Sequence, residues 1–205
     1  MPIITIDGNI GAGKSSIMSY INMKYGVNTD TEPIHIWQPF LDDMYCNKQN
    51  ASFNMQVRVW FDRCLIDLPV KNKVVLMERS PYFQRNVFIP TNVENGSITD
   101  IQYSMLQDMY NKTDTIWSPT QYIYLHSEPD KCIERIAKRA RKSENAITEQ
   151  YLRRLHELNE DTYSKGLADD KPIKCIYVEG KTIEEIGEEV WLAMNIDSCH
   201  KNVDY

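Results

Sequence analysis

The chain has 205 residues, of which 42% are hydrophobic and 25% charged, and its formal net charge is −6. These values fit a single globular domain over residues 1–205, and the acidic balance argues against a protein that binds nucleic-acid backbones. No segment approaches eighteen apolar residues, and five scattered cysteines lack metal-site spacing, so we expect no membrane span and a reducing, cytoplasmic location.

Short apolar runs alternate with helical patterns along the whole chain. Strands are predicted at residues 2–7, 33–37, 73–78, 121–126 and 173–178. Helices are predicted at 16–21, 50–68, from Pro81, 97–113 (capped by Ser97 or Thr99), 129–139, 148–163 and 182–194. This alternation predicts an α/β fold in which helices cover both faces of a five-stranded parallel sheet.

The first strand leads into a glycine-rich segment that fits the phosphate-loop pattern G-x-x-x-x-G-K-[ST] in full. Backbone N–H groups of such a loop surround phosphate oxygens at the start of a helix. Lys14 is expected to reach the terminal phosphates and Ser15 to bind Mg²⁺. The predicted nucleoside-triphosphate site of this P-loop fold comprises Gly8, Asn9, Ile10, Gly11, Ala12, Gly13, Lys14, Ser15 and Ser16.

Charged residues end the strand predicted at 73–78. Glu78 and Arg79 are expected at the carboxyl edge of the sheet, where open α/β folds bind their ligands. There Glu78 could hold Mg²⁺ together with Ser15, and Arg79 could neutralise charge on a transferring phosphoryl group. A surface salt bridge is the alternative interpretation.

A second acidic position follows the first helix. Glu32 precedes Pro33, and Trp37 lies at the end of the short strand predicted at 33–37. The carboxylate could accept a hydroxyl proton, and the indole could stack on a flat base. Glu-Pro dipeptides also mark ordinary turns.

A basic run lies between residues 135 and 142 in this otherwise acidic chain. It contains Arg135, Lys138, Arg139, Arg141 and Lys142. A solvated helix face is the commonest role of such a run. Beside a phosphate loop, however, it is typical of a lid that excludes water from the donor, and we expect one at about 135–146.

Residues 111–114 spell the N-K-x-D pattern with which GTPases recognise guanine. Here the pattern ends a predicted helix instead of following a buried strand. The chain also contains no D-x-x-G switch element. A GTPase is therefore excluded.

Taken together, these segments resemble the deoxyribonucleoside kinases, and the likeness extends over nearly the whole chain. The shared motifs are Gly8–Ser15, Glu32-Pro33 with Trp37, Met44-Tyr45, Gln56, Glu78-Arg79-Ser80 with Arg85 and Phe88, the basic lid, and Leu155–Leu158. The resemblance implies transfer of the ATP γ-phosphoryl to the 5′-hydroxyl of a deoxynucleoside, with Mg²⁺, in a nucleotide-salvage homodimer.

The resemblance also implies a role for each matching residue. Glu32 would be the general base, Arg79 would hold the hydroxyl region, and Lys14 would stabilise charge. The acceptor would be bound by Glu32, Trp37, Tyr45, Gln56, Arg63, Arg79, Gln84, Phe88 and Glu144. Tyr45 and Glu144 would take the sugar 3′-hydroxyl, and Gln56 the base edge. Arg135, Arg139 and Arg141 would contact ATP.

Two positions bear on the choice of base. Arg63 matches members that use deoxycytidine or purines, in which this arginine pairs with an aspartate. The corresponding position here is Gln84. The base preference stays open, with a lean toward broad or cytidine and purine use.

Two other functions stay open at this point. A nucleoside monophosphate kinase shares the phosphate loop and lid, but it needs cations where this chain has Glu32. A regulatory module that binds ATP without catalysis would leave Tyr45, Gln56 and Glu144 unexplained.

Overall fold

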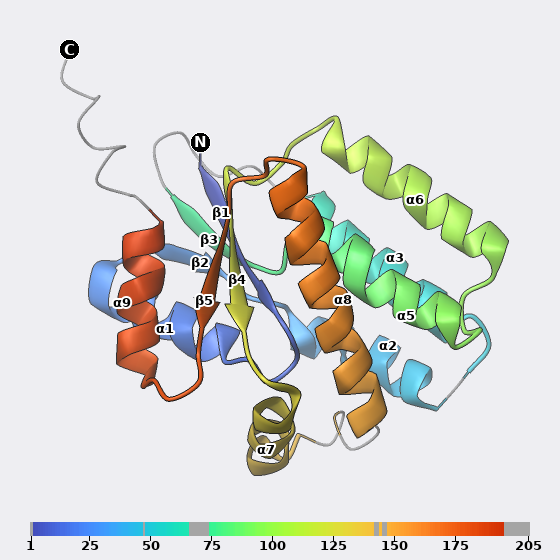
Figure 1. Ribbon diagram of the computed structural model, residues 1–205. Coiled ribbons are helices and arrows are strands. Elements are labelled where there is room, and N and C mark those ends of the chain that lie inside the picture. The colour runs from blue at the N-terminus through green and yellow to red at the C-terminus, as the bar shows by residue number, and fades with distance from the viewer. Residues whose placement is uncertain (1, 47, 66–73, 142–143, 145–146, 195–205) are drawn as a thin grey trace.

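The computed structural model describes residues 2–46, 48–65, 74–141, 144 and 147–194 (Figure 1). Five strands form one sheet: β1 (Ile3–Gly8), β2 (Asn28–Asp30), β3 (Val75–Glu78), β4 (Gln121–His126) and β5 (Ile173–Tyr177). Their order is β2-β3-β1-β4-β5, and every neighbouring pair is parallel. The predicted five-stranded parallel sheet is confirmed.

Both faces of the sheet are covered by helices because the buried strands alternate between two apolar clusters. On β4, Ile123 and Leu125 join the cluster beneath α1 (Lys14–Tyr25) and α9 (Ile183–Ala193). Tyr122 and Tyr124 point to the opposite cluster, which includes residues of α8 (Glu149–Ala168). Figure 1 shows α1 and α9 on one side of the sheet and α8 on the other.

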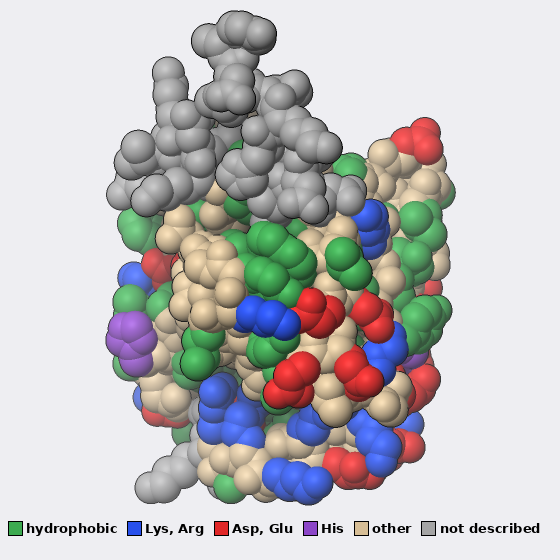
Figure 2. Space-filling model, turned by 90° about the vertical axis from the view of Figure 1, so that its left-hand side faces the viewer, with side chains coloured by type: hydrophobic (Ala, Val, Ile, Leu, Met, Phe, Trp, Pro, Cys, Tyr) green, Lys and Arg blue, Asp and Glu red, His purple; other side chains and the backbone are tan. Residues whose placement is uncertain are grey.

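The α1–α9 face carries interspersed acidic and basic side chains (Figure 2). An ion pair between Lys24 and Glu188, at 2.5 Å, joins these two helices. Their rings also pack, because Tyr25 and Trp191 stack with centroids 4.0 Å apart. Polar and aromatic contacts at the rim thus reinforce the apolar cluster beneath.

The remaining described helices are α2 (Ile34–Tyr45), α3 (Ala51–Cys64), α4 (Pro81–Phe83), the π-helix η1 (Gln84–Phe88), α5 (Ile89–Glu94), α6 (Asp100–Asp114) and α7 (Pro129–Arg139). Thr99 caps α6 in a capping box with Gln102, as predicted. The N-K-x-D pattern ends this helix, also as predicted. No described helix combines the length and apolar character that crossing a bilayer requires.

The strand predicted at 33–37 is wrong. Helix α2 begins at Ile34, directly after Pro33 at the N-cap position. The apolar residues from Ile34 to Met44 recur with helical spacing and pack around buried Trp37 and α3. The actual second strand, β2, is the short polar segment Asn28–Asp30, which lacks the apolar run of a buried strand.

The sequence also did not predict the helical bend after Pro81. Residues Gln84–Phe88 form a π-turn that leads into α5. Pro90 follows in the first turn of α5, and it has no N–H to donate. A widened turn accommodates the proline ring, which would clash with a carbonyl in a regular helix. Such turns are frequent at functional sites.

The ends of β1 and β3 are joined by a buried carboxyl group. Asp7 Oδ1 accepts a hydrogen bond of 2.8 Å from the Ser80 N–H. Within the described residues, Asp7 Oδ2 and Thr5 Oγ1 are buried without a partner. Burial raises the pKa of Asp7 to about 6, although the Ser80 hydrogen bond and the Arg79 charge oppose the shift. Asp7 is therefore mostly protonated in the folded protein only below about pH 6.

We predict that the Asp7→Asn variant gains stability relative to wild type as pH rises. The folded pKa is about 6, above the ordinary aspartate value of about 3.9, so the folded state binds more protons between these values. Wild-type stability therefore falls as pH rises through that window. Between pH 4 and pH 7 the free energy of unfolding of Asp7→Asn should rise by about 2 kcal/mol relative to that of wild type.

Urea unfolding of both proteins across this pH range measures the difference. Asp161→Asn, an exposed change on α8, serves as the control and should give a flat difference. A flat difference for Asp7→Asn as well would contradict the prediction.

Candidate active site

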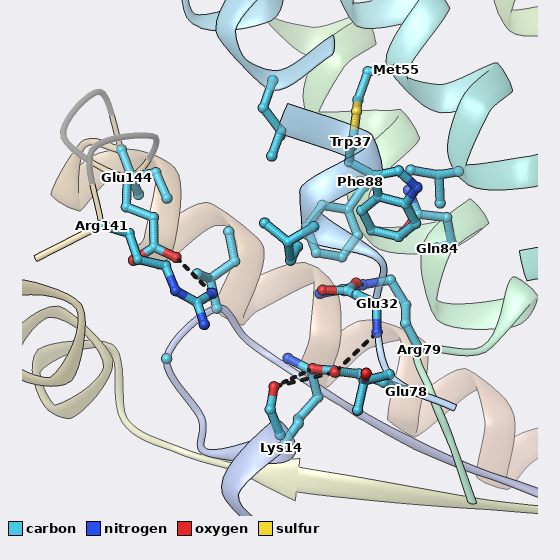
Figure 3. Close-up of a pocket in the computed structure, with 18 of the residues that line it drawn as sticks. Lys14, Glu32, Trp37, Met55, Glu78, Arg79, Gln84, Phe88, Arg141 and Glu144 are labelled. Atoms are coloured by element: carbon cyan, nitrogen blue, oxygen red, sulfur yellow. Dashed lines mark hydrogen bonds and ion pairs between the residues drawn. The ribbon is translucent and has the colours of Figure 1, made fainter. Parts of the chain in front are cut away.

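A cavity of about 470 Å³ opens at the carboxyl ends of β1 and β3 (Figure 3). Its walls come from the phosphate loop, α2, α3, η1, α8 and the segment after α7. Most predicted site residues line it: Ile10, Gly11, Gly13, Lys14, Ser15, Ser16, Glu32, Trp37, Tyr45, Gln56, Glu78, Arg79, Gln84, Phe88, Arg139, Arg141 and Glu144. Segments far apart in the sequence therefore meet in one cavity.

The phosphate loop is shaped by glycines that no other residue could replace without strain. Gly8 has φ 139°, and a Cβ there would lie 2.6 Å from the Leu125 carbonyl oxygen. Gly11 has φ 84°, and a Cβ there would lie 2.7 Å from the Cys132 carbonyl oxygen. Asn9 fixes the loop to α8, because its Nδ2 donates to the Leu152 carbonyl at 3.0 Å. The loop is thus held between β4, α7 and α8.

Lys14 begins α1 and curls back over the loop. Its Nζ donates to the carbonyl oxygens of Gly8, at 3.1 Å, and Asn9, at 3.0 Å. Burial and the Arg79 charge lower the pKa of this lysine, whereas nearby carboxylates oppose the shift. The ammonium therefore lies inside the loop, where a phosphate group would be bound.

Ser15 and Glu78 form an oxygen-donor pair beside Lys14. The Ser15 hydroxyl donates to the Glu78 carboxylate at 3.1 Å. Burial and the neighbouring Glu32 charge raise the pKa of Glu78. A divalent cation would relieve both effects, and a hydroxyl with a carboxylate is a donor set that suits Mg²⁺. The residues present therefore fit this metal ion.

Glu32 and Arg79 form a hydrogen-bonded ion pair near the middle of the cavity (Figure 3). Their side chains are only 14% and 6% exposed. Burial alone would raise the pKa of Glu32, but the charges of Arg79 and Lys14 hold it below its usual value. Glu32 is therefore an ionised carboxylate that can accept a proton, as a general base must.

Arg79 is held in place from three sides. Its backbone has φ 67°, unusual for a residue with a side chain, and its N–H donates to the Ile6 carbonyl at 3.0 Å. Its guanidinium lies 4.0 Å from the centre of the Phe88 ring, a cation–π geometry. This backbone turn brings Arg79 to Glu32 while the preceding Glu78 reaches Ser15.

The far end of the cavity is aromatic and amide-rich. Trp37 is buried, and its indole N–H donates to Asp62 at 2.7 Å. Gln84 Nε2 donates to Gln56 Oε1 at 2.7 Å, so η1 orients the amide of α3. Figure 3 shows Trp37, Phe88 and Gln84 at this end, above Glu32. The arrangement suits a flat, polar-edged group such as a nucleobase.

Arg63, predicted to bind substrate, points elsewhere in the structure. Its guanidinium pairs with Asp30 at 3.0 Å and donates to the Glu78 carbonyl at 3.4 Å. It is buried but is not among the residues that line the cavity. The partner that replaces the expected aspartate therefore lies on β2, and Gln84 bonds to Gln56 instead.

The basic segment contributes three cavity residues. Arg139 Nε donates to Glu144 at 2.9 Å, and Arg141 lies 3.7 Å from the same carboxylate. Burial and the Glu144 charge raise the pKa of Tyr45 to about 12, which agrees with a position for Tyr45 near Glu144. Residues 142, 143, 145 and 146 of the predicted lid lie outside the described residues.

Arg135 belongs to the phosphate-loop side of α7. It donates to the Ser127 hydroxyl at 2.8 Å and to the Gly11 carbonyl at 3.4 Å. Through these contacts Arg135 braces the loop from outside. The structure thus places it beside the loop but not in the cavity wall.

Sequence reasoning missed several lining residues. Tyr151 of α8 faces the cavity, and burial raises its pKa above the usual value. Met55 and Val59 of α3 line the base end, and Asn92 of α5 lies nearby. The i, i+4 spacing of Met55 and Val59 was a usable signal, whereas nothing local to Asn92, which lies beyond the π-turn on the helical segment that starts at Pro81, indicates that it reaches the cavity.

Comparison with known proteins agrees with this geometry. The sequence model of the deoxynucleoside kinase family matches residues 4–199. A protein of Invertebrate iridescent virus 3, described as a kinase, is 34% identical over 166 residues, which cover 80% of this chain and 83% of that protein. Human mitochondrial thymidine kinase 2 is 27% identical over 174 residues, covering 80% of this chain and 65% of that protein.

A solved structure supports the same assignment. Deoxyadenosine kinase from M. mycoides superposes with a TM-score of 0.81 at 26% identity, covering 94% of this chain and 98% of that one. These matches favour phosphorylation of a nucleoside over that of a nucleoside monophosphate. The chain therefore belongs to the deoxynucleoside kinase family, whose members are ATP-dependent enzymes that phosphorylate the 5′-hydroxyl of deoxynucleosides.

Proposed function

We propose that this deoxynucleoside kinase uses Glu32 as the general base for the acceptor 5′-hydroxyl. The observation that carries the proposal is the ionised Glu32 carboxylate, buried against Arg79 between the phosphate loop and the aromatic end of one cavity. A 5′-hydroxyl beside this carboxylate loses its proton as it attacks the γ-phosphorus. Arg79 then stabilises the negative charge that develops on the transferring group.

The acceptor would be held by the opposite end of the cavity. Trp37 and Phe88 would flank the base plane, and the Gln56 amide would bind its edge. Tyr45 and Glu144 would bind the sugar 3′-hydroxyl, which would tie the acceptor to the segment after α7. All five of these side chains line the cavity, which supports the assignment of the base and sugar contacts.

ATP would occupy the phosphate-loop end. The loop N–H groups and Lys14 would bind the β- and γ-phosphates, and Arg139 and Arg141 would close over them. Mg²⁺ held by Ser15 and Glu78 would neutralise charge on these phosphates and hold them in line with the acceptor. The Ser15–Glu78 contact supports this assignment.

The proposal also accounts for the unphosphorylated acceptor. A monophosphate would bring two negative charges toward the Glu32 carboxylate. Among the described residues, the side chain that pairs with this carboxylate at hydrogen-bond distance is Arg79. A hydroxyl group carries no such charge and can donate to the carboxylate. The geometry at Glu32 therefore supports a nucleoside acceptor.

We infer a broad base preference from the neutral groups at the base end. Gln56 and Gln84 can donate and accept, while Arg63 is paired with Asp30. The deoxyadenosine kinase of M. mycoides has been solved with dATP and with dCTP, a purine and a pyrimidine nucleotide. That precedent supports acceptance of both base classes here.

A homodimer in the cytoplasm completes the proposed picture. Exposed apolar side chains on the packed helices α3 and α6 support self-association: Phe61 is 54%, Ile101 76% and Met105 51% exposed. The scattered cysteines support a reducing compartment.

Glu32→Gln should abolish most turnover and leave substrate binding intact. The amide keeps the size and a hydrogen bond to Arg79 but cannot accept the hydroxyl proton, so kcat should fall about 10²- to 10⁴-fold. Steady-state kinetics with Mg·ATP and calorimetric binding of each substrate measure both effects. Asp43→Asn, an exposed change on α2, is the matched control, and near-normal turnover in Glu32→Gln would exclude Glu32 as the base.

A panel of the four deoxynucleosides tests the function and the base preference together. We expect product from at least one purine and one pyrimidine substrate with Mg·ATP. Phosphorylation of dTMP without phosphorylation of any nucleoside would overturn the proposed acceptor. Absence of product with all of them would favour a noncatalytic ATP-binding module.

Gln56→Leu should weaken nucleoside binding selectively. A buried polar base edge left without a partner costs about 1–3 kcal/mol, so the KM for the nucleoside should rise about 10- to 100-fold. The KM for ATP should not change. Gln150→Leu, an exposed change on α8, controls for the substitution type, and an unchanged nucleoside KM in Gln56→Leu would remove Gln56 from base recognition.

A further inference from the structure

A second cluster of chemically reactive side chains lies between β4 and α8, outside the cavity wall. It consists of His126, His156 and Glu160, each offering one ligand atom within 4.8 Å of the others. His126 Nε2 lies 3.6 Å from Glu160 Oε1, and the two imidazole rings meet edge to face with centroids 5.4 Å apart. None of these residues has a role in the phosphoryl transfer proposed above.

The fold brings the three side chains together in a simple way. His126 is the last residue of β4. His156 and Glu160 are four residues apart on α8, so they share one face of the helix one turn apart. Because α8 packs on the same sheet face as Tyr124, this helix face lies against the end of β4. A strand end and one helical turn thus supply three converging donors.

The imidazole groups carry polar atoms that need a partner. Within the described residues, Nδ1 of His126 and Nδ1 of His156 are both buried without a hydrogen-bond partner. Such atoms are costly to bury unsatisfied, and two in one cluster are unusual. His126 Nε2 is the nitrogen that faces Glu160, so an ion in the cluster would bind there, and the unpaired Nδ1 atoms show that protein contacts leave both rings incompletely satisfied.

The surroundings resemble those of a metal site in two further respects. The Tyr124 hydroxyl donates to Glu160, an outer contact of the kind that orients a carboxylate ligand. The cluster is also accessible, because the Glu160 side chain is 38% exposed and the neighbouring Tyr177 60% exposed. A hydrated ion can therefore enter, and water can complete its coordination.

We propose that His126, His156 and Glu160 bind a divalent transition-metal ion, with Zn²⁺ the best chemical match. Two imidazoles and one carboxylate form a three-ligand set that leaves one tetrahedral position for water. Imidazole nitrogen favours Zn²⁺ over Mg²⁺, whereas the oxygen pair of Ser15 and Glu78 suits Mg²⁺. The two sites therefore select different ions in the same protein.

The ion would act as a clamp between sheet and helix. Helix α8 supplies Tyr151 to the cavity and the Leu152 carbonyl to Asn9 of the phosphate loop. His126 precedes Ser127, whose hydroxyl accepts a hydrogen bond from Arg135, the residue that also contacts the phosphate loop. A metal ion that joins β4 to α8 would thus stabilise the scaffold beside the ATP end without touching either substrate.

Metal titration of the purified full-length protein tests the proposal. The protein is stripped with EDTA, dialysed, and titrated with Zn²⁺ in excess Mg²⁺, which competes at the Ser15–Glu78 site. We expect one equivalent to bind and the melting temperature to rise. Co²⁺ in place of Zn²⁺ should give visible absorption bands that report nitrogen coordination.

Single substitutions assign the binding to this cluster. His126→Gln, His156→Gln and Glu160→Gln should each weaken Zn²⁺ binding at least tenfold and remove the Co²⁺ bands. Glu157→Gln, an exposed change on the same helix, should bind as wild type. Of the three substitutions, Glu160→Gln should disturb folding least, because the Glu160 side chain is partly exposed to solvent.

Two results would overturn the proposal. The wild-type protein could fail to bind Zn²⁺ when Mg²⁺ is in excess, or Glu160→Gln and His126→Gln could bind it as tightly as wild type while folded by circular dichroism. Neither result bears on the kinase function, because the nucleoside panel measures that activity separately.

Discussion

The buried ion pair between Glu32 and Arg79 is the interaction on which the rest of the site depends. Each charge makes the other's burial tolerable, since an unpaired charge in this position would be neutralised or would destabilise the fold. Arg79 keeps Glu32 ionised, and Glu32 keeps Arg79 over the Phe88 ring. The phosphate-loop end and the aromatic end of the cavity meet at this pair.

A single backbone feature lets one strand serve both ends. At the end of β3, Glu78 turns to Ser15 and the phosphate loop, while Arg79, with its positive φ, turns to Glu32. The two carboxylates consequently differ in pKa direction, lowered for Glu32 and raised for Glu78. Environment, more than residue type, thus sets the two carboxylates apart, and this difference supports the separate roles proposed for them.

Much of the fold follows from local pattern, and the failures have physical causes. The bounds of β4 and α7 were predicted to the residue, because a continuous apolar run and a proline at the first helical position are strong local signals. The start of helix α2 was predicted as a strand because residues 33–37 alone resemble a short apolar strand. The helical spacing of its apolar residues is visible only over the full length from Ile34 to Tyr45. The pairing of Arg63 with Asp30 was not predicted, because Asp30 lies on β2, 33 residues away in the chain. Nothing local to α8 indicates that Tyr151 reaches the cavity; that depends on how the helix packs.

The contacts of Lys14 have a consequence for the pace of the reaction cycle. Its ammonium donates to two carbonyl oxygens of its own loop, so a triphosphate bound as proposed above would have to displace them. Loss of these two hydrogen bonds would therefore offset part of the attraction between lysine and phosphate. The same carbonyls would accept these hydrogen bonds again once the nucleotide leaves. If Lys14 binds the donor as proposed, these carbonyls would compete with the phosphate for the ammonium, which would favour exchange of the nucleotide over its tight retention.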